Sequence, residues 1–144
     1  MLEHIFFLAN SAALFSWISL IVLRRWNALL FTLRWGVVGL LSLLYAVLVS
    51  VYFFRVQGGG YFSLAAIETL FTSSEVVLAG WIHYLAFDLF VGLWIAARSD
   101  EVGLSRLVQA PILLATFMFG PVGYLFFLAA RASVRANPSK ETFA

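Results

Sequence analysis

Long apolar stretches dominate the hydropathy pattern of this chain, and its polar residues gather between them. Each stretch is close to the twenty or so residues that a helix needs to cross the hydrocarbon core of a bilayer. Arginines stand at the ends of the stretches, where they would meet lipid head groups. The pattern predicts four transmembrane helices, at residues 2–23, 35–54, 76–97 and 107–130.

A helical bundle is the fold that this pattern favours. Backbone polar groups find no water within a bilayer, so only helices and closed barrels span it. The short alternating segments of a barrel are not seen in the sequence. We therefore predict an all-α fold, an integral membrane four-helix bundle. Residues 1–135 form its single transmembrane domain, and a flexible polar tail follows at 136–144.

The connection between the second and third predicted helices is long and contains an apolar piece of its own. Gly58, Gly59 and Gly60 interrupt any helix, and the apolar run 61–71 that follows is too short to span. We expect an interfacial or re-entrant segment there. The third helix should begin near Glu75, because hydroxyl residues precede it and a carboxylate suits a helix N-terminus.

The composition agrees with a membrane protein and narrows its partners. Hydrophobic residues make up 63% of the chain and charged residues 11%, whereas a soluble domain needs roughly a quarter charged. The net charge is +2 and the basic residues are dispersed, so we expect membrane lipids and no nucleic acid as partners. There is no cysteine, which excludes thiolate metal sites and cysteine nucleophiles.

The third predicted helix carries the residues most suited to chemistry. His83 and Asp88 lie inside an apolar helix, where ionisable groups are costly and normally face a bundle interior or a wet cavity. Five helical positions place them about 140° apart, so they contact different neighbours or line two sides of one pocket. In a purely structural alternative, Asp88 hydrogen-bonds to a neighbouring helix.

Glycine and aromatic residues near this pair suggest where an apolar ligand could lie. A Gly-Pro pair should kink the fourth helix, and Gly92 should allow close approach, so we predict a pocket between the third and fourth helices. No histidine spacing supports a haem, and we expect neither a metal nor a cofactor. The predicted ligand-binding residues are Glu75, Trp81, Tyr84, Phe87, Gly92, Gly120 and Pro121.

The segments 80–92 (GWIHYLAFDLFVG) and 120–123 (GPVG) resemble the ABA4-like family. Its plant members are chloroplast membrane proteins required for neoxanthin synthesis. The resemblance implies a carotenoid or related isoprenoid lipid as ligand and a non-redox, epoxide-opening isomerisation. We expect Asp88 to act as the acid and His83 as the base or orienting partner, although these two roles could be exchanged. The resemblance leaves open a non-catalytic pigment or lipid binder and an accessory subunit of a membrane complex.

For the location of the protein, we expect the bacterial inner membrane, since no transit peptide precedes the first apolar stretch. A homo-oligomer is left open as well.

Overall fold

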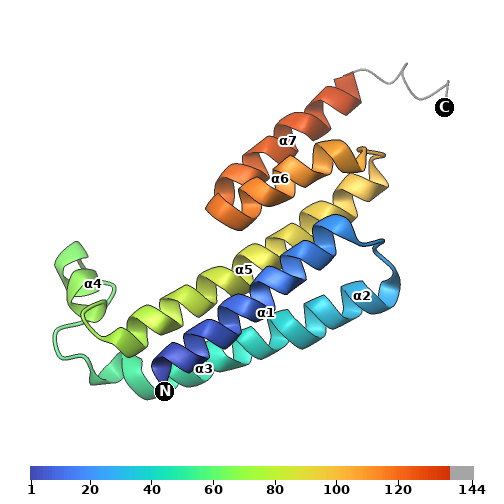
Figure 1. The fold of residues 1–144 in the computed structure, drawn as a ribbon. Helices are drawn as coiled ribbons and strands as arrows, with labels where there is room; N and C mark the ends of the chain where they lie inside the picture. Colours follow the sequence, from blue (N-terminus) through green and yellow to red (C-terminus); the bar gives the residue numbers. More distant parts are fainter. Residues whose placement is uncertain (137–144) are drawn as a thin grey trace. The chain divides into compact units, whose positions relative to one another are not determined.

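The structure, a computed structural model, describes residues 1–136, and the regular secondary structure in this range is all helical (Figure 1). The described chain forms two compact units. The first unit comprises residues 1–16 and 26–87, and the second comprises residues 17–25 and the chain from residue 88 onward. Helices α1 (Leu2–Val22) and α5 (Ser74–Glu101) each contribute one part to each unit.

Within the described residues, three helices are long and apolar enough to cross a membrane: α1, the continuous helix Asn27–Arg55, and α5. The predicted spans 2–23 and 76–97 coincide with α1 and lie within α5. The predicted span 35–54 starts too late, because the helix already begins at Asn27 and runs through Arg34. That arginine is exposed, so its long side chain can extend away from the apolar surface without ending the helix. The helix of 27–55 consists of α2 (Asn27–Phe31), the π-helical η1 (Thr32–Val38), α3 (Gly39–Tyr52) and the 3-10 turn η2 (Phe53–Arg55).

The predicted single helix at 107–130 is wrong. The chain forms two shorter helices there, α6 (Arg106–Phe119) and α7 (Pro121–Ala136), which pack against each other (Figure 1). They have 14 and 16 residues, fewer than a full crossing requires. Gly120 separates them with φ of 41°, a left-handed conformation that favours glycine. The Gly-Pro pair therefore breaks the helix completely instead of kinking it.

The link before α5 contains a short helix, and α5 begins at Ser74, close to the predicted start at Glu75. A short helix, α4 (Leu64–Leu70), occupies part of the apolar run, and Ser63 caps it by accepting a hydrogen bond from the Ala66 amide. The amide of Val76 donates to Ser73 Oγ at 3.4 Å, so a hydroxyl caps the start of α5 as well. Of the predicted tail, residues 137–144 lie outside the described part of the chain.

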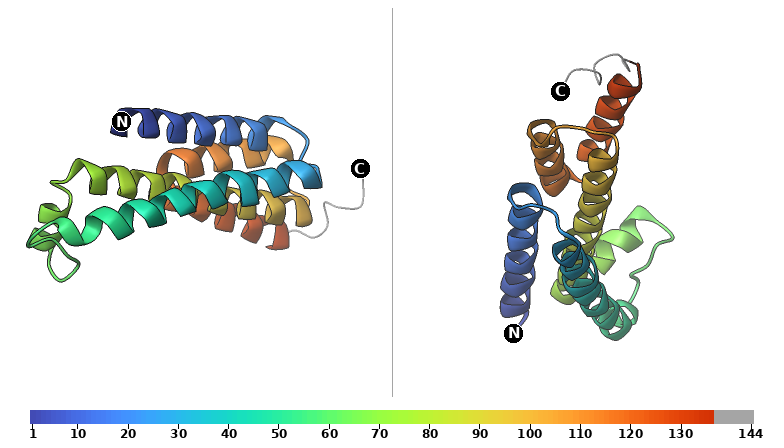
Figure 2. Two further views of the ribbon diagram at one scale, coloured as in Figure 1. Left: turned by 90° about the horizontal axis from the view of Figure 1, so that it is seen from below. Right: turned by 90° about the vertical axis from the view of Figure 1, so that its right-hand side faces the viewer.

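The first unit has its core where α1, α3 and α5 meet (Figure 2). Small residues on α1 and on α5 let these helices approach closely, and leucines of α3 fill the space between side chains. The buried cluster consists of Ala9, Ala13, Leu41, Leu48, Leu78, Ala79, Ile82, Leu85 and Ala86. It fixes the rotation of α5 about its own axis in this unit.

The second unit has a core of its own. Trp17 at the end of α1 and Leu93 on α5 are almost completely buried, as are Leu113 on α6 and Phe127 on α7. Trp94 packs against Phe127 with ring centroids 5.6 Å apart. These contacts hold the hairpin of α6 and α7 around the second half of α5.

Candidate functional site

Helix α5 carries most of the predicted site residues, and the boundary between the two units divides them. Glu75, Trp81, His83, Tyr84 and Phe87 belong to the first unit. Asp88, Gly92, Gly120 and Pro121 belong to the second unit. The geometry of each group is therefore described within its own unit.

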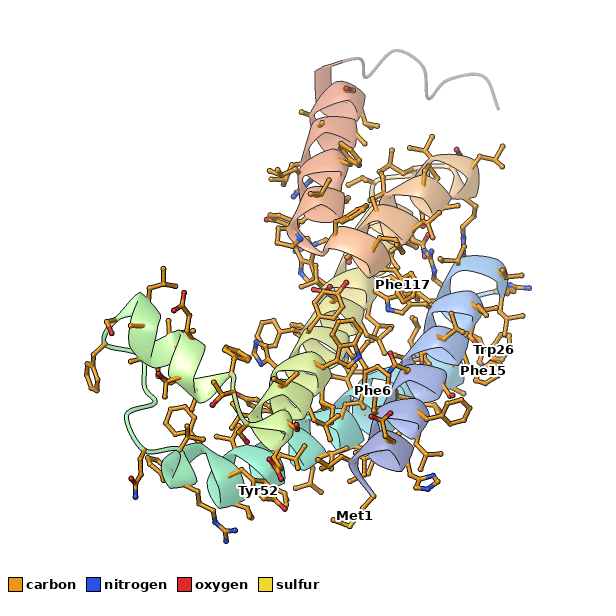
Figure 3. The ribbon with its side chains drawn as sticks, turned by 60° about the vertical axis from the view of Figure 1, so that its left-hand side comes forward. Met1, Phe6, Phe15, Trp26, Tyr52 and Phe117 are labelled. Carbon is orange, nitrogen blue, oxygen red and sulfur yellow. The ribbon has the colours of Figure 1, made fainter. Side chains whose placement is uncertain are left out.

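Trp81 is held on the side of α5 that faces α1. Its indole Nε1 donates a hydrogen bond to Asn10 Oδ1 at 3.1 Å. Its ring contacts Phe6 of α1 at 6.0 Å between centroids and Tyr84 at 5.3 Å. Figure 3 shows Phe6 where α1 passes α5. A hydrogen bond across two apolar helices is a specific contact in a membrane, where no water competes for either partner.

A groove of about 670 Å³ lies beside Trp81 in the first unit. The first turns of α1, the residues just before α5 and the first turns of α5 line it. Its walls are apolar and aromatic, and hydroxyl and carboxyl groups stand among them. The lining residues are Met1, Leu2, Glu3, Phe6, Phe71, Thr72, Ser74, Val77, Leu78 and Trp81.

Of the predicted ligand-binding residues in this unit, Trp81 alone lines that groove. Glu75 is instead engaged locally, where its Oε2 accepts a hydrogen bond from Ser73 Oγ at 2.8 Å. Tyr84 is not part of the lining, and its ring packs against that of Trp81. The sequence did not indicate Phe6 or Phe71, because the approach of α1 to the start of α5 depends on the tertiary fold.

A second groove, of about 290 Å³, is entirely aliphatic. Residues of α1 and of the helix 27–55 form it, and they offer no side-chain hydrogen bond. It fits a hydrocarbon chain and provides nothing that would select one end of a molecule over another. Its lining is Ile5, Leu8, Ala9, Ala12, Val37, Leu40, Leu41 and Leu44.

His83 is exposed, although the sequence suggested that it would face the bundle interior. The core cluster explains the difference: Ile82 is fully buried, and each helical step turns the next side chain by about 100°. His83 therefore lies on the side of α5 toward α3. Its ring stacks on Phe87 at 5.0 Å and contacts Tyr45 of α3 at 5.1 Å, between centroids.

Asp88 lies against the turn that joins α6 and α7. A Cβ atom built on Gly120 would stand 2.6 Å from Asp88 Oδ1 and 3.0 Å from Oδ2. Helix α7 begins at the next residue, Pro121, so the carboxyl group of Asp88 lies close to the first turn of this helix. The structure thus places Asp88 beside Gly120, the residue before Pro121. Asp88 is half-buried.

Gly92 does not provide ligand space, contrary to its predicted role. A Cβ atom at this position would stand 2.3 Å from Cη2 of Trp17, so the indole already fills the gap. Trp17 is 2% exposed and its ring contacts Phe117 at 5.6 Å. The glycine is needed for packing within the second unit.

A polar network that the sequence did not indicate lies at the end of this unit. The Arg25 side chain is 2% exposed, and its Nη1 donates to both carboxylate oxygens of Asp100 at 3.0 Å. It also donates to Gln109 Oε1 and to the carbonyl of Ala96. Gln109 Nε2 completes the network by donating to Asp100 Oδ1 at 2.9 Å. The signal in the sequence was Gln109, a polar residue on the apolar side of α6.

Burial and ion pairing act in opposite directions on Arg25. Desolvation lowers the pKa of its guanidinium, and the hydrogen bond and charge of Asp100 raise it. A guanidinium remains protonated at every physiological pH. The network therefore links the ends of α1 and α5 to the start of α6 through a permanently charged side chain.

Within residues 1–136, no group of three or more acidic, histidine or cysteine side chains is arranged to hold a metal ion. No curated protein and no solved structure matches the chain. The sequence profile of the ABA4-like family, described as ABA DEFICIENT 4-like, does match, over residues 4–127. That range includes nearly all of α1, the helix Asn27–Arg55, α5 and the hairpin as far as Phe127. The resemblance carried by residues 80–92 and 120–123 is thus confirmed, and the chain belongs to the ABA4-like family.

Proposed function

We propose that this protein binds a carotenoid or a related isoprenoid lipid that reaches it through the membrane. The observation that carries the proposal is the groove of about 670 Å³ beside Trp81. Family membership and three apolar helices of membrane-spanning length support the same conclusion. We also propose that the protein is located in the bacterial inner membrane.

The lining of the groove suits one end of an elongated amphiphile. Phe6, Phe71 and Trp81 offer flat apolar surfaces against which a ring or a polyene can pack. Glu3, Thr72 and Ser74 offer groups that can hydrogen-bond to a polar substituent. These polar residues lie at the ends of α1 and α5, the level at which polar lipid groups meet water.

The finer proposal is an epoxide-opening isomerisation in which Asp88 moves the proton. A carboxylic acid at this position donates its proton to the epoxide oxygen as the carbon–oxygen bond breaks. The resulting carboxylate then removes a proton from the adjacent polyene carbon, and an allene forms. One proton is given and one is recovered, so the product is an isomer and no oxidant or reductant is consumed. The half-buried carboxyl group of Asp88 supports this role.

The test of binding is the absorption spectrum of the full chain purified gently from a carotenoid-producing host. Mass spectrometry then identifies the extracted lipid, and size-exclusion chromatography reports any homo-oligomer. Val77 lines the groove, and Val47 of α3 is similarly exposed but lies outside its lining. Val77→Trp should therefore reduce the bound lipid per protein, and Val47→Trp should leave it unchanged. Equal retention in the two variants would refute the groove as the binding site.

The test of catalysis is conversion of the extracted ligand to a compound of equal mass and altered spectrum. Asp88→Asn preserves the shape of the side chain and removes its titratable proton, so turnover should be lost while ligand is retained. Ligand that stays unchanged in the wild type supports a non-catalytic binder instead. If His83→Gln also lost turnover, the base would be the imidazole of His83 and not the carboxylate of Asp88.

A further inference from the structure

We propose that Tyr45, His83 and Phe87 form a second binding site, open to the lipid, for a flat carbonyl-bearing ring such as the head group of an isoprenoid quinone. This site, the quinone site, lies on the side of α5 toward α3. The groove beside Trp81 uses the side toward α1. The two sites therefore have different linings and can be tested separately.

The imidazole of His83 is the reason to expect a ligand here. It is exposed, its ring stacks on Phe87 and lies tilted against Tyr45, and within residues 1–136 its side chain makes no hydrogen bond. Helix α5 has 28 residues, and His83 lies about 7 Å along the axis from its middle. At that depth the surrounding lipid is hydrocarbon, which offers no hydrogen bond to a ring N–H. A polar group left in this state is costly unless a partner satisfies it.

The chemistry of the quinone site narrows the class of molecule that could satisfy the imidazole of His83. Phospholipid esters and the hydroxyl groups of amphiphiles stay near the interface, whereas a quinone ring enters the hydrocarbon region with its carbonyl groups. A carbonyl oxygen can accept the hydrogen bond that the imidazole N–H donates. The ring can also stack on Phe87, which is 58% exposed and parallel to the imidazole to within 25°. A bare metal ion does not fit, because a single histidine supplies one ligand where metal sites need several.

The experiment is a titration of the full-length protein, reconstituted in quinone-free phospholipid vesicles, with decylubiquinone. Quenching of intrinsic tryptophan fluorescence reports binding. The wild type should show saturable quenching, and His83→Leu should weaken binding about threefold to tenfold, the loss of one hydrogen bond. Phe87→Leu should also weaken it, through lost stacking. His4→Leu is the matched control, since His4 is exposed on the first turn of α1 and outside the site.

Three outcomes would overturn the proposal. Unchanged affinity in His83→Leu would show that the imidazole does not contact the quinone. If His83→Leu instead altered the oligomeric state in detergent, these residues would form a contact with a second copy of the chain. If it reduced carotenoid retention without affecting quinone binding, they would belong to the isoprenoid site. Loss of carotenoid binding in the wild type would refute the proposed function and leave this titration unaffected.

Discussion

The indole of Trp17 occupies the space above Gly92. A single added carbon on the glycine would lie 2.3 Å from the indole Cη2 and 2.6 Å from Cζ3. Both residues belong to the second unit, and the tryptophan is its most bulky buried side chain. The contact shows why Gly92, which the sequence predicted to bind a ligand, serves as a packing surface for Trp17 instead.

Gly92→Ala should destabilise the protein by about 1–3 kcal/mol, because the rigid indole must move to admit the methyl group. The measurement is thermal unfolding in detergent, followed by near-UV circular dichroism. Gly39→Ala is the control: its new Cβ would meet nothing within 4 Å, so it should be neutral or slightly stabilising. Trp17→Leu in the Gly92→Ala background should recover part of the loss. Equal melting temperatures for the two single alanine variants would contradict the close contact.

Arg25 should contribute more to stability than its neighbour Arg24. Arg25→Gln removes a buried donor from Asp100, Gln109 and the Ala96 carbonyl, and should cost about 1–3 kcal/mol. The expected cost is lower than that for breaking a fully buried ion pair, because the Asp100 side chain is 42% exposed. Arg24→Gln, at an exposed position, should change stability little. Urea or thermal unfolding of the two variants in detergent makes the comparison, and a similar loss in both would argue that only net charge matters.

The hydropathy pattern was sufficient to locate the three long apolar helices, although the second begins earlier than predicted, because apolar length is encoded locally. It also indicated a special role for Gly120 and Pro121, since both have known effects on backbone geometry. It could not distinguish a kink from a complete break, which depends on the positive φ of Gly120 and on packing between α6 and α7. A run of apolar residues gives the same hydropathy pattern whether it forms one helix or two.

The site could be predicted only in part, for a related reason. The ionisable residues of α5 are visible in the sequence, but the side of the helix that is buried is set by α1 and α3. The core passes through Ile82 and Leu85, which turns His83 outward and Trp81 toward Asn10. The network of Arg25, Asp100 and Gln109 joins residues separated by as many as 84 positions, and no local pattern announces such contacts.

Gly123 should be the least tolerant glycine of the hairpin. An added Cβ would lie 2.1 Å from Thr116 Oγ1 and 2.3 Å from the Thr116 backbone nitrogen, and backbone cannot yield as a side chain can. Gly123→Ala should therefore separate α6 from α7 and cost about 3 kcal/mol or more. Cysteines introduced on facing positions of α6 and α7 would report the separation by loss of cross-linking. Retained cross-linking with an unchanged melting temperature would mean that the helices do not approach so closely.

The hydrogen bond between Trp81 and Asn10 should be measurable as a coupling energy between α1 and α5. Trp81→Phe removes the indole donor, Asn10→Leu removes its acceptor, and the double variant removes both, so the cycle isolates the pair. Interhelical hydrogen bonds within membranes are worth about 0.6 kcal/mol on average, and we expect a coupling of that size. Asn10 Nδ2 also donates to the Phe6 carbonyl at 2.8 Å, a contact that Trp81→Phe leaves intact. The single variants should then differ, with Asn10→Leu the more destabilising because it leaves the indole N–H without its partner. Strictly additive changes in the free energy of unfolding would show that the two side chains do not interact. Another contact would then have to orient Trp81 in the wall of the groove.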